Sequence, residues 1–168
     1  AGAKADAVTD WDLTTGAIIA ESKLGTPPAI RVTALAHTAV FEAVNAITRR
    51  YPGGLLPTER AAGASVEAAV AAAHRATLRR LLPAQHAAIE AAYQAALSKL
   101  AEGPAREAGI AVGEGAAAAV LALRGDDDAG ASHAYRPHTT AGAYVPTTTP
   151  AVPQWQQRKP WLMASPGQ

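Results

Sequence analysis

The sequence predicts an all-α fold, with about five helices in residues 1–128 and an extended arm over residues 129–168. Hydrophobic residues make up 49% of the 168 residues but aromatic residues only 5%, and alanine alone supplies about a quarter of the chain. Residues that favour strands are scarce before residue 130. Proline and glycine divide the first 128 residues into segments whose apolar spacing is typical of helices.

Two helices are expected before residue 51. The first covers about residues 6–24, where Trp11 and Ile18 belong to an irregular apolar stripe that ends before a Gly-Thr-Pro-Pro segment. The second covers about residues 28–50, with Pro28 in the first turn, where a missing N–H donor costs nothing. Its apolar residues recur at steps of three and four, so one face is expected to be buried.

Three further helices are expected over about residues 65–82, 84–100 and 105–123. Ser65 is the expected N-cap of the first, with Glu67 near its positive end. The last contains three glycines among alanines, which lowers helix stability unless close contact with another helix compensates. We therefore expect a tightly packed central helix there, ended by the glycine at position 125. The three glycines are Gly109, Gly113 and Gly115.

The arm differs from the helical body in composition and charge. Half of the twelve prolines and half of the eight aromatic residues lie in residues 129–168, which carry three cations and no carboxylate. Residues 1–128 have a net charge of −2, so the arm is suited to contact an acidic surface. Aromatic residues spaced six to eleven residues apart favour an arm pinned to a helical surface over a flexible tail. They are Tyr135, Tyr144, Trp155 and Trp161.

The composition excludes several classes of function. The net charge of +1 is too small for a nucleic-acid-binding face, so no nucleic acid partner is expected. No run of about 18 apolar residues is present, so no membrane span is expected. The absence of cysteine excludes disulfides, thiolate metal sites and cysteine nucleophiles.

The histidines do not form a metal-binding pattern. Neither a His-x-x-x-His pair nor a Glu-x-x-His pair is present, so no metal site is expected. His37 is followed by Glu42 and Asn45 on the second helix, where a buried polar cluster is conceivable. A histidine satisfied by a neighbouring carbonyl or side chain is the favoured interpretation. The histidines are His37, His74, His86, His133 and His138.

Other charged clusters have structural explanations. The triple aspartate at residues 126–128 lacks the glycine and glutamate of a calcium-binding loop, so a solvated acidic turn is expected. The pairs Arg49-Arg50 and Arg79-Arg80 lie near helix ends, where cations interact favourably with the helix dipole. No nucleophile elbow, Walker loop or dinucleotide-binding glycine motif is present. No catalytic, cofactor-binding or metal-binding residue is therefore assigned.

A family resemblance covers nearly the whole chain. The stretch Ala34-Leu35-Ala36-His37-Thr38-Ala39-Val40-Phe41-Glu42-Ala43-Val44-Asn45-Ala46-Ile47, followed by Tyr51-Pro52, resembles the amino-terminal helical region of bacterial vanadium-dependent haloperoxidase-like proteins of the type 2 phosphatidic acid phosphatase superfamily. Residues 7–11, residues 64–82 with Gln85, and residues 109–114 are similar to neighbouring helices of that region. Tyr135-Arg136-Pro137, residues 150–155 and Lys159-Pro160-Trp161-Leu162 resemble the segment that leads into the catalytic half.

The resemblance implies that this chain is one part of a larger helical bundle. Family members hold vanadate or phosphate with a lysine, an Arg-Pro arginine, a Pro-Ser-Gly-His segment and a downstream arginine and histidine. Arg136-Pro137-His138 and Ser165-Pro166-Gly167 match fragments of these motifs in the wrong order and spacing. The resemblance therefore implies a non-catalytic scaffold whose vanadate or phosphate would be bound by residues beyond position 168.

Two functional hypotheses follow. In the first, the chain is the amino-terminal scaffold of a haloperoxidase or phosphatase, and its partner is a second polypeptide or a carboxy-terminal half with the catalytic motifs. In the second, it is a stand-alone helical binding or assembly protein that docks through its arm; a homo-oligomer is a further alternative. The sequence starts at Ala1 of Ala-Gly-Ala-Lys, an end that signal cleavage would leave, so an exported protein, periplasmic or secreted, is expected. Truncation would leave the same end.

Overall fold

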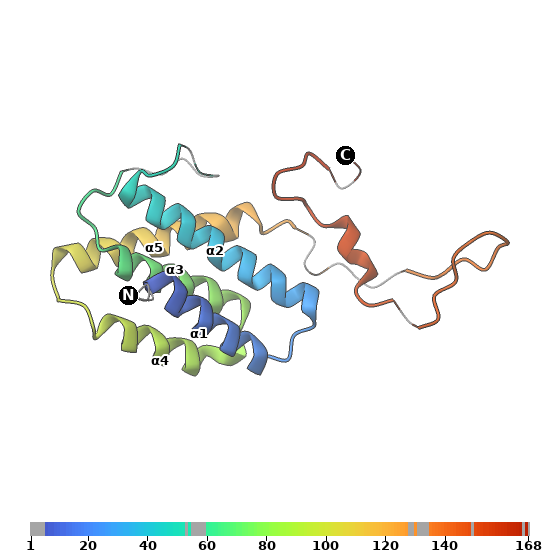
Figure 1. Ribbon diagram of the computed structural model, residues 1–168, viewed down its shortest axis with the longest axis horizontal. Helices are drawn as coiled ribbons and strands as arrows, with labels where there is room; N and C mark the ends of the chain where they lie inside the picture. Colours follow the sequence, from blue (N-terminus) through green and yellow to red (C-terminus); the bar gives the residue numbers. More distant parts are fainter. Residues whose placement is uncertain are drawn as a thin grey trace, which may run out of the picture. The chain divides into compact units, whose positions relative to one another are not determined.

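The computed structural model describes residues 6–52, 54, 60–127, 130, 135–148, 150–165 and 167. Within these residues the structure is all-α and contains no strand, so the predicted fold class is confirmed (Figure 1). The α-helices are α1 (Ala7–Glu21), α2 (Thr26–Thr48), α3 (Val66–Leu81), α4 (His86–Leu97) and α5 (Pro104–Leu123), and the short 3₁₀ helices are η1 (Pro83–Gln85) and η2 (Pro153–Gln157).

The chain divides into two compact units, residues 1–123 and residues 124–168. The first unit, which we call the body, contains the five α-helices. The second unit, which we call the arm, begins five residues earlier than the arm expected from composition. The reason is that the acidic turn after α5 pairs with cations of the arm, as described below.

Helix α3 is the centre of the body, because α1, α2, α4 and α5 all contact it. The sequence predicted that the fifth helix would be the central one, and this prediction was wrong. Two features of α3 account for its central position. Its alanine-rich stretch from Ala68 to Ala73 is completely buried, and small side chains allow neighbouring helices to approach from several sides. Leu78, near its end, is also fully buried.

The helix boundaries follow local chemistry. Ser65 caps α3 as predicted, accepting a 3.1 Å hydrogen bond from the backbone N–H of Ala68. The first turn of α2 contains Pro28, as expected. Helix α1 ends at Glu21, three residues before the expected position, because Lys23 adopts a left-handed conformation (φ 54°). The fourth predicted helix is divided into η1 and α4, and the helix ends at Leu97.

Helix α5 packs on α3 through two of its glycines. A Cβ atom at Gly109 would lie 2.4 Å from the carbonyl oxygen of Ser65, and one at Gly113 would lie 2.3 Å from that of Ala69. Gly115 has open space at the corresponding position. The close helix contact expected from the glycine content is therefore present at two of the three glycines.

Candidate functional site

His37 was considered as part of a polar cluster with Glu42 and Asn45, and the structure gives it other partners. Its Nε2 lies 3.0 Å from the carboxylate of Asp12 on α1. Its ring meets the ring of His74 edge to face, with centroids 6.2 Å apart. His37 is thus satisfied by neighbouring side chains, as the favoured interpretation predicted.

His74 is the most enclosed histidine described. Only 1% of the residue is exposed, and the ring stacks on Trp11 with a centroid distance of 5.1 Å. Its Nδ1–H donates a 3.0 Å hydrogen bond to the carbonyl of Val70, so Nε2 carries the lone pair of the neutral ring. Nε2 is buried and has no hydrogen-bond partner among the described residues. Burial lowers the pKa of His74 to about 4, so the ring is neutral at pH 7.

The burial of His74 limits the chemistry that the pair of His37 and His74 can perform. A general base must reach the proton that it removes, and His74 is closed off from solvent. In the residues that the structure describes, no group of three histidine, aspartate or glutamate side chains is placed to hold a metal ion. His86 and His138 are exposed, and His133 lies outside the described residues. The Trp11–His74 stack therefore serves packing between α1 and α3.

Glu42 and Asn45 contact residues that follow α2. Glu42 is 1% exposed, and a Cβ atom at Gly54 would lie 2.1 Å from its Oε2, so a larger residue at position 54 would require this carboxylate to move. Asn45 accepts a hydrogen bond from the N–H of Tyr51 (3.0 Å) and donates one to its carbonyl (3.1 Å). The two side chains thus contact Tyr51 and Gly54, which follow α2.

The acidic turn is a structural element of the arm. Asp127 is 2% exposed and accepts a 3.1 Å hydrogen bond at Oδ1 from Arg158, whose guanidinium also donates to its backbone carbonyl. Lys159 binds the exposed Asp126 at 3.0 Å. The expectation of a solvated turn is therefore wrong for Asp127 and correct for Asp126, while Asp128 lies outside the described residues. Arg158 and Lys159 of the arm therefore pair with the acidic residues of this turn.

The two tryptophans of the arm pack on arginines of the same unit. The guanidinium of Arg124 lies 4.5 Å from the ring centroid of Trp161 and donates to the carbonyls of Lys159 and Pro160. The guanidinium of Arg158 lies 4.1 Å from the ring of Trp155. Cation–π contacts add to the ion pairs and hold the ends of the arm together. We call this set the clasp; it consists of Arg124, Asp126, Asp127, Trp155, Arg158, Lys159 and Trp161.

The paired arginines lie at helix ends, as predicted. Arg79 and Arg80 occupy the last turn of α3, and an Nη atom of Arg79 lies 4.0 Å from Glu90. Arg49 is the C-cap of α2 in a left-handed conformation, and Arg50 lies over the ring of Tyr51 at 5.6 Å. None of these contacts indicates a phosphate site.

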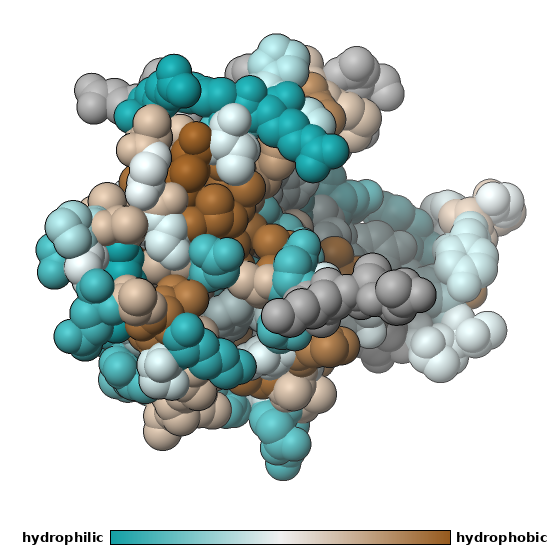
Figure 2. All heavy atoms as spheres, turned by 60° about the vertical axis from the view of Figure 1, so that its left-hand side comes forward, coloured by the Kyte–Doolittle hydropathy of each residue, from teal (hydrophilic) through white to brown (hydrophobic). Residues whose placement is uncertain are grey.

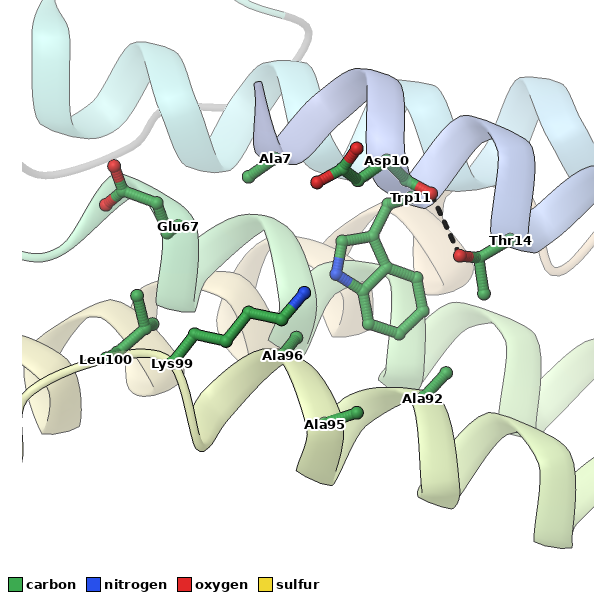
Figure 3. A pocket seen from close by; sticks show the side chains of 10 residues that line it. All are labelled: Ala7, Asp10, Trp11, Thr14, Glu67, Ala92, Ala95, Ala96, Lys99 and Leu100. Atoms are coloured by element: carbon green, nitrogen blue, oxygen red, sulfur yellow. Dashed lines mark hydrogen bonds between the residues drawn. The ribbon is translucent and has the colours of Figure 1, made fainter. Parts of the chain in front are cut away.

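A pocket of about 310 Å³ opens between α1, the start of α3 and the end of α4. Figure 3 shows the indole of Trp11 as one wall and three alanines of α4 opposite it. The alanines leave open the space that larger side chains would fill. Sequence reasoning did not find this pocket, because it depends on how α1 and α4 are placed on α3. The alanines are Ala92, Ala95 and Ala96.

The comparisons with known proteins found no match to a family model, a curated protein or a solved structure. None of the helices in the described part of the chain is long and apolar enough to cross a membrane.

Proposed function

We propose that this chain is the non-catalytic amino-terminal scaffold of a vanadium-dependent haloperoxidase-like or acid phosphatase-like enzyme. The observation that carries the proposal is the distribution of apolar residues on α2, the helix that contains most of the stretch on which the family resemblance rests. The inner face of α2 buries Leu35, Ala39 and Ala43 completely against the body. The proposal concerns what covers the opposite face.

Large apolar side chains remain exposed on the outer side of α1 and α2. Leu13 is 70% exposed, Ile30 63% and Phe41 41%. Figure 2 shows one face of the molecule, on which hydrophobic patches lie among hydrophilic residues. A helix that is apolar on opposite sides is typical of a helix packed between two layers. This pattern supports a second helical layer over α2, which is where the scaffold would meet its catalytic partner.

Two buried or half-buried arginines of the described residues are already paired with carboxylates, which supports an anion site outside this chain. Vanadate or phosphate requires several converging cations, as a phosphoryl-transfer transition state does. Arg75 is held by Glu90 at 2.8 Å and by Glu114 at 3.3 Å. Arg158 is paired with Asp127 inside the clasp. We therefore assign no chemical step to this chain, and the proposal places the anion-binding residues beyond position 168.

Sequencing the encoding gene past Gln168 tests this proposal. The expected result is a continuous or adjacent reading frame with an Arg-Pro arginine, a Pro-Ser-Gly-His segment and a downstream arginine and histidine. The intact mass of the natural protein provides a second test, because a scaffold should be isolated with a companion polypeptide or as part of a larger chain. A lone 17.1 kDa species without such a reading frame would reject the proposal and favour a stand-alone binding protein.

A further inference from the structure

Three buried polar atoms on α1 and α3 have no hydrogen-bond partner in the part of the chain that the structure describes. They are Oγ1 of Thr15 on α1, and Nε2 of His74 and Oγ1 of Thr77 on α3. At most 1% of each of these residues is exposed. A buried polar atom without a partner is costly, and most such atoms in folded proteins are paired with the protein or with ordered water.

The three atoms come from neighbouring levels of the contact between α1 and α3. The starts of both helices line the same pocket, and Trp11 stacks on His74 further along, so the two helices run in the same direction (Figure 1). Thr15 follows Trp11 by one turn, and Thr77 follows His74 by one turn. At a rise of about 1.5 Å per residue, the two threonines lie about 6 Å and about 4.5 Å beyond the stacked rings.

Other threonines of these helices satisfy their hydroxyl groups within their own helix. Each donates a hydrogen bond of 2.7 to 3.2 Å to the carbonyl four residues earlier. Thr15 and Thr77 are more deeply buried than these threonines, and neither hydroxyl forms such a bond. Both hydroxyls can therefore pair with a partner in the helix contact. The threonines bonded within their helix are Thr14, Thr33, Thr38 and Thr48.

The three atoms restrict the chemistry of a partner that they share. Nε2 of the neutral His74 ring accepts a hydrogen bond, whereas each threonine hydroxyl can donate and accept. None of the three groups carries a charge, and the site is closed to solvent, so an ion would lose its hydration without gaining a counter-charge. The partner is therefore neutral, very small, and able both to donate and to accept. Water has these properties.

We propose that the contact between α1 and α3 binds one buried water molecule, which donates to Nε2 of His74 and pairs with the hydroxyls of Thr15 and Thr77. Three protein partners are the usual number for a buried water. The water would join the middle of α1 to α3 by hydrogen bonds, beside the stack of Trp11 on His74. This inference goes beyond the scaffold function and does not depend on it.

Two magnetic resonance measurements at pH 7 test the water directly. The ¹⁵N chemical shift of His74 Nε2 reports whether its lone pair accepts a hydrogen bond. Oxygen-17 relaxation dispersion of the solvent counts long-lived waters, because the hydroxyl oxygens of the protein do not exchange. We expect a hydrogen-bonded Nε2 in the unmodified chain, and one long-lived water fewer in the double variant Thr15→Val/Thr77→Val. A free lone pair or an equal number of waters would overturn the proposal.

The stability of single variants gives an independent readout, because valine has the shape of threonine without the hydroxyl. Thr15→Val and Thr77→Val should each raise the equilibrium constant of unfolding about fivefold, as expected for a lost hydrogen bond. The effects should be non-additive in the double variant, because both hydroxyls share one partner. Urea denaturation at pH 7 measures all three constants.

Thr33→Val is the matched control, because its hydroxyl donates to a carbonyl of its own helix, α2. Its effect on unfolding should add to that of Thr77→Val. A gain of stability in Thr15→Val or Thr77→Val, as expected for removal of an unpaired hydroxyl, would contradict the shared water. Additive effects of Thr15→Val and Thr77→Val would contradict it as well.

Discussion

At the residue scale, the surroundings of His74 explain why a histidine is tolerated in the core. Trp11 covers one face of the ring, and the carbonyl of Val70 accepts the Nδ1 proton. His37 contacts the ring of His74 edge to face and is itself paired with Asp12. The buried ring stays neutral, and a proton on it would be costly because the charged form would lose its hydration.

The lowered pKa of His74 makes the stability of the body dependent on pH. The unfolded chain takes up a proton near pH 6.5, and the folded chain does so only near pH 4. Stability is therefore full above about pH 6.5 and falls as the pH is lowered toward 4, by about 3 kcal/mol from this group. Urea denaturation at pH 7 and pH 4.5 measures the difference.

His74→Leu removes this titration and keeps an apolar group beside Trp11. The variant should lose less stability between pH 7 and pH 4.5 than the unmodified chain. His86→Gln, which changes an exposed histidine at the start of α4, serves as the control and should retain the full pH dependence. The same pH dependence in all three proteins would mean that His74 does not carry the effect.

The residue-scale contacts were the part that the sequence could not predict. Trp11 and His74 are separated by 63 positions, and nothing in their local spacing indicates that they stack. The same applies to Asp127 and Arg158, whose pairing depends on the fold of the arm. His37 was expected to be satisfied by a neighbouring carbonyl or side chain, but its partner on another helix could be found only in three dimensions.

At the element scale, glycine decides how closely α5 approaches α3. Gly113→Ala would bring a methyl group within 3 Å of backbone and side-chain atoms of α3, with no flexible side chain to yield. We expect a loss of about 2 kcal/mol or more in the free energy of unfolding, because the two helices must separate. Chemical denaturation gives this value directly.

Gly115→Ala is the matched control on the same helix. A Cβ atom there meets nothing within 4 Å, so the higher helix propensity of alanine should stabilise the body by about 0.5–1 kcal/mol. Both substitutions add one methyl group, at positions two residues apart. Their effects on the free energy of unfolding should have opposite signs. Equal effects of the two would refute the account of the contact between α3 and α5.

The helices themselves could be predicted because their signals are local. Ser65 and Pro28 act within one turn of the chain, and both were recognised as signals at helix starts. The end of α1 was missed because the left-handed conformation of Lys23 has no glycine to indicate it. The central position of α3 was missed because alanine content indicates close packing without indicating which helix lies in the middle.

At the scale of the whole molecule, the clasp determines whether the arm is an ordered unit. Asp127 is buried beside the guanidinium of Arg158, with that of Arg124 at 4.0 Å. Asp127→Asn removes the charge between two partly buried cations, which is destabilising because they lose their counter-ion. We expect faster proteolysis within residues 124–168 of this variant.

Asp126→Asn provides the control for the clasp. Its carboxylate is exposed and contacts Lys159 at the surface, where ion pairs contribute little. Limited proteolysis followed by mass spectrometry should show the arm of this variant cleaved at the rate of the unmodified chain. If Asp127→Asn were equally resistant, the buried pair would not be what orders the arm.

The central claim is that this chain supports an active site without supplying its reactive groups. Two activity assays test this claim most directly: vanadate-dependent oxidation of bromide by peroxide, and vanadate-sensitive hydrolysis of an aryl phosphate. Both assays compare residues 1–168 with the product of the complete reading frame. The account predicts one of these activities in the complete product and neither in residues 1–168 alone. Activity of the 168-residue chain by itself, or no activity in a folded complete product, would contradict it.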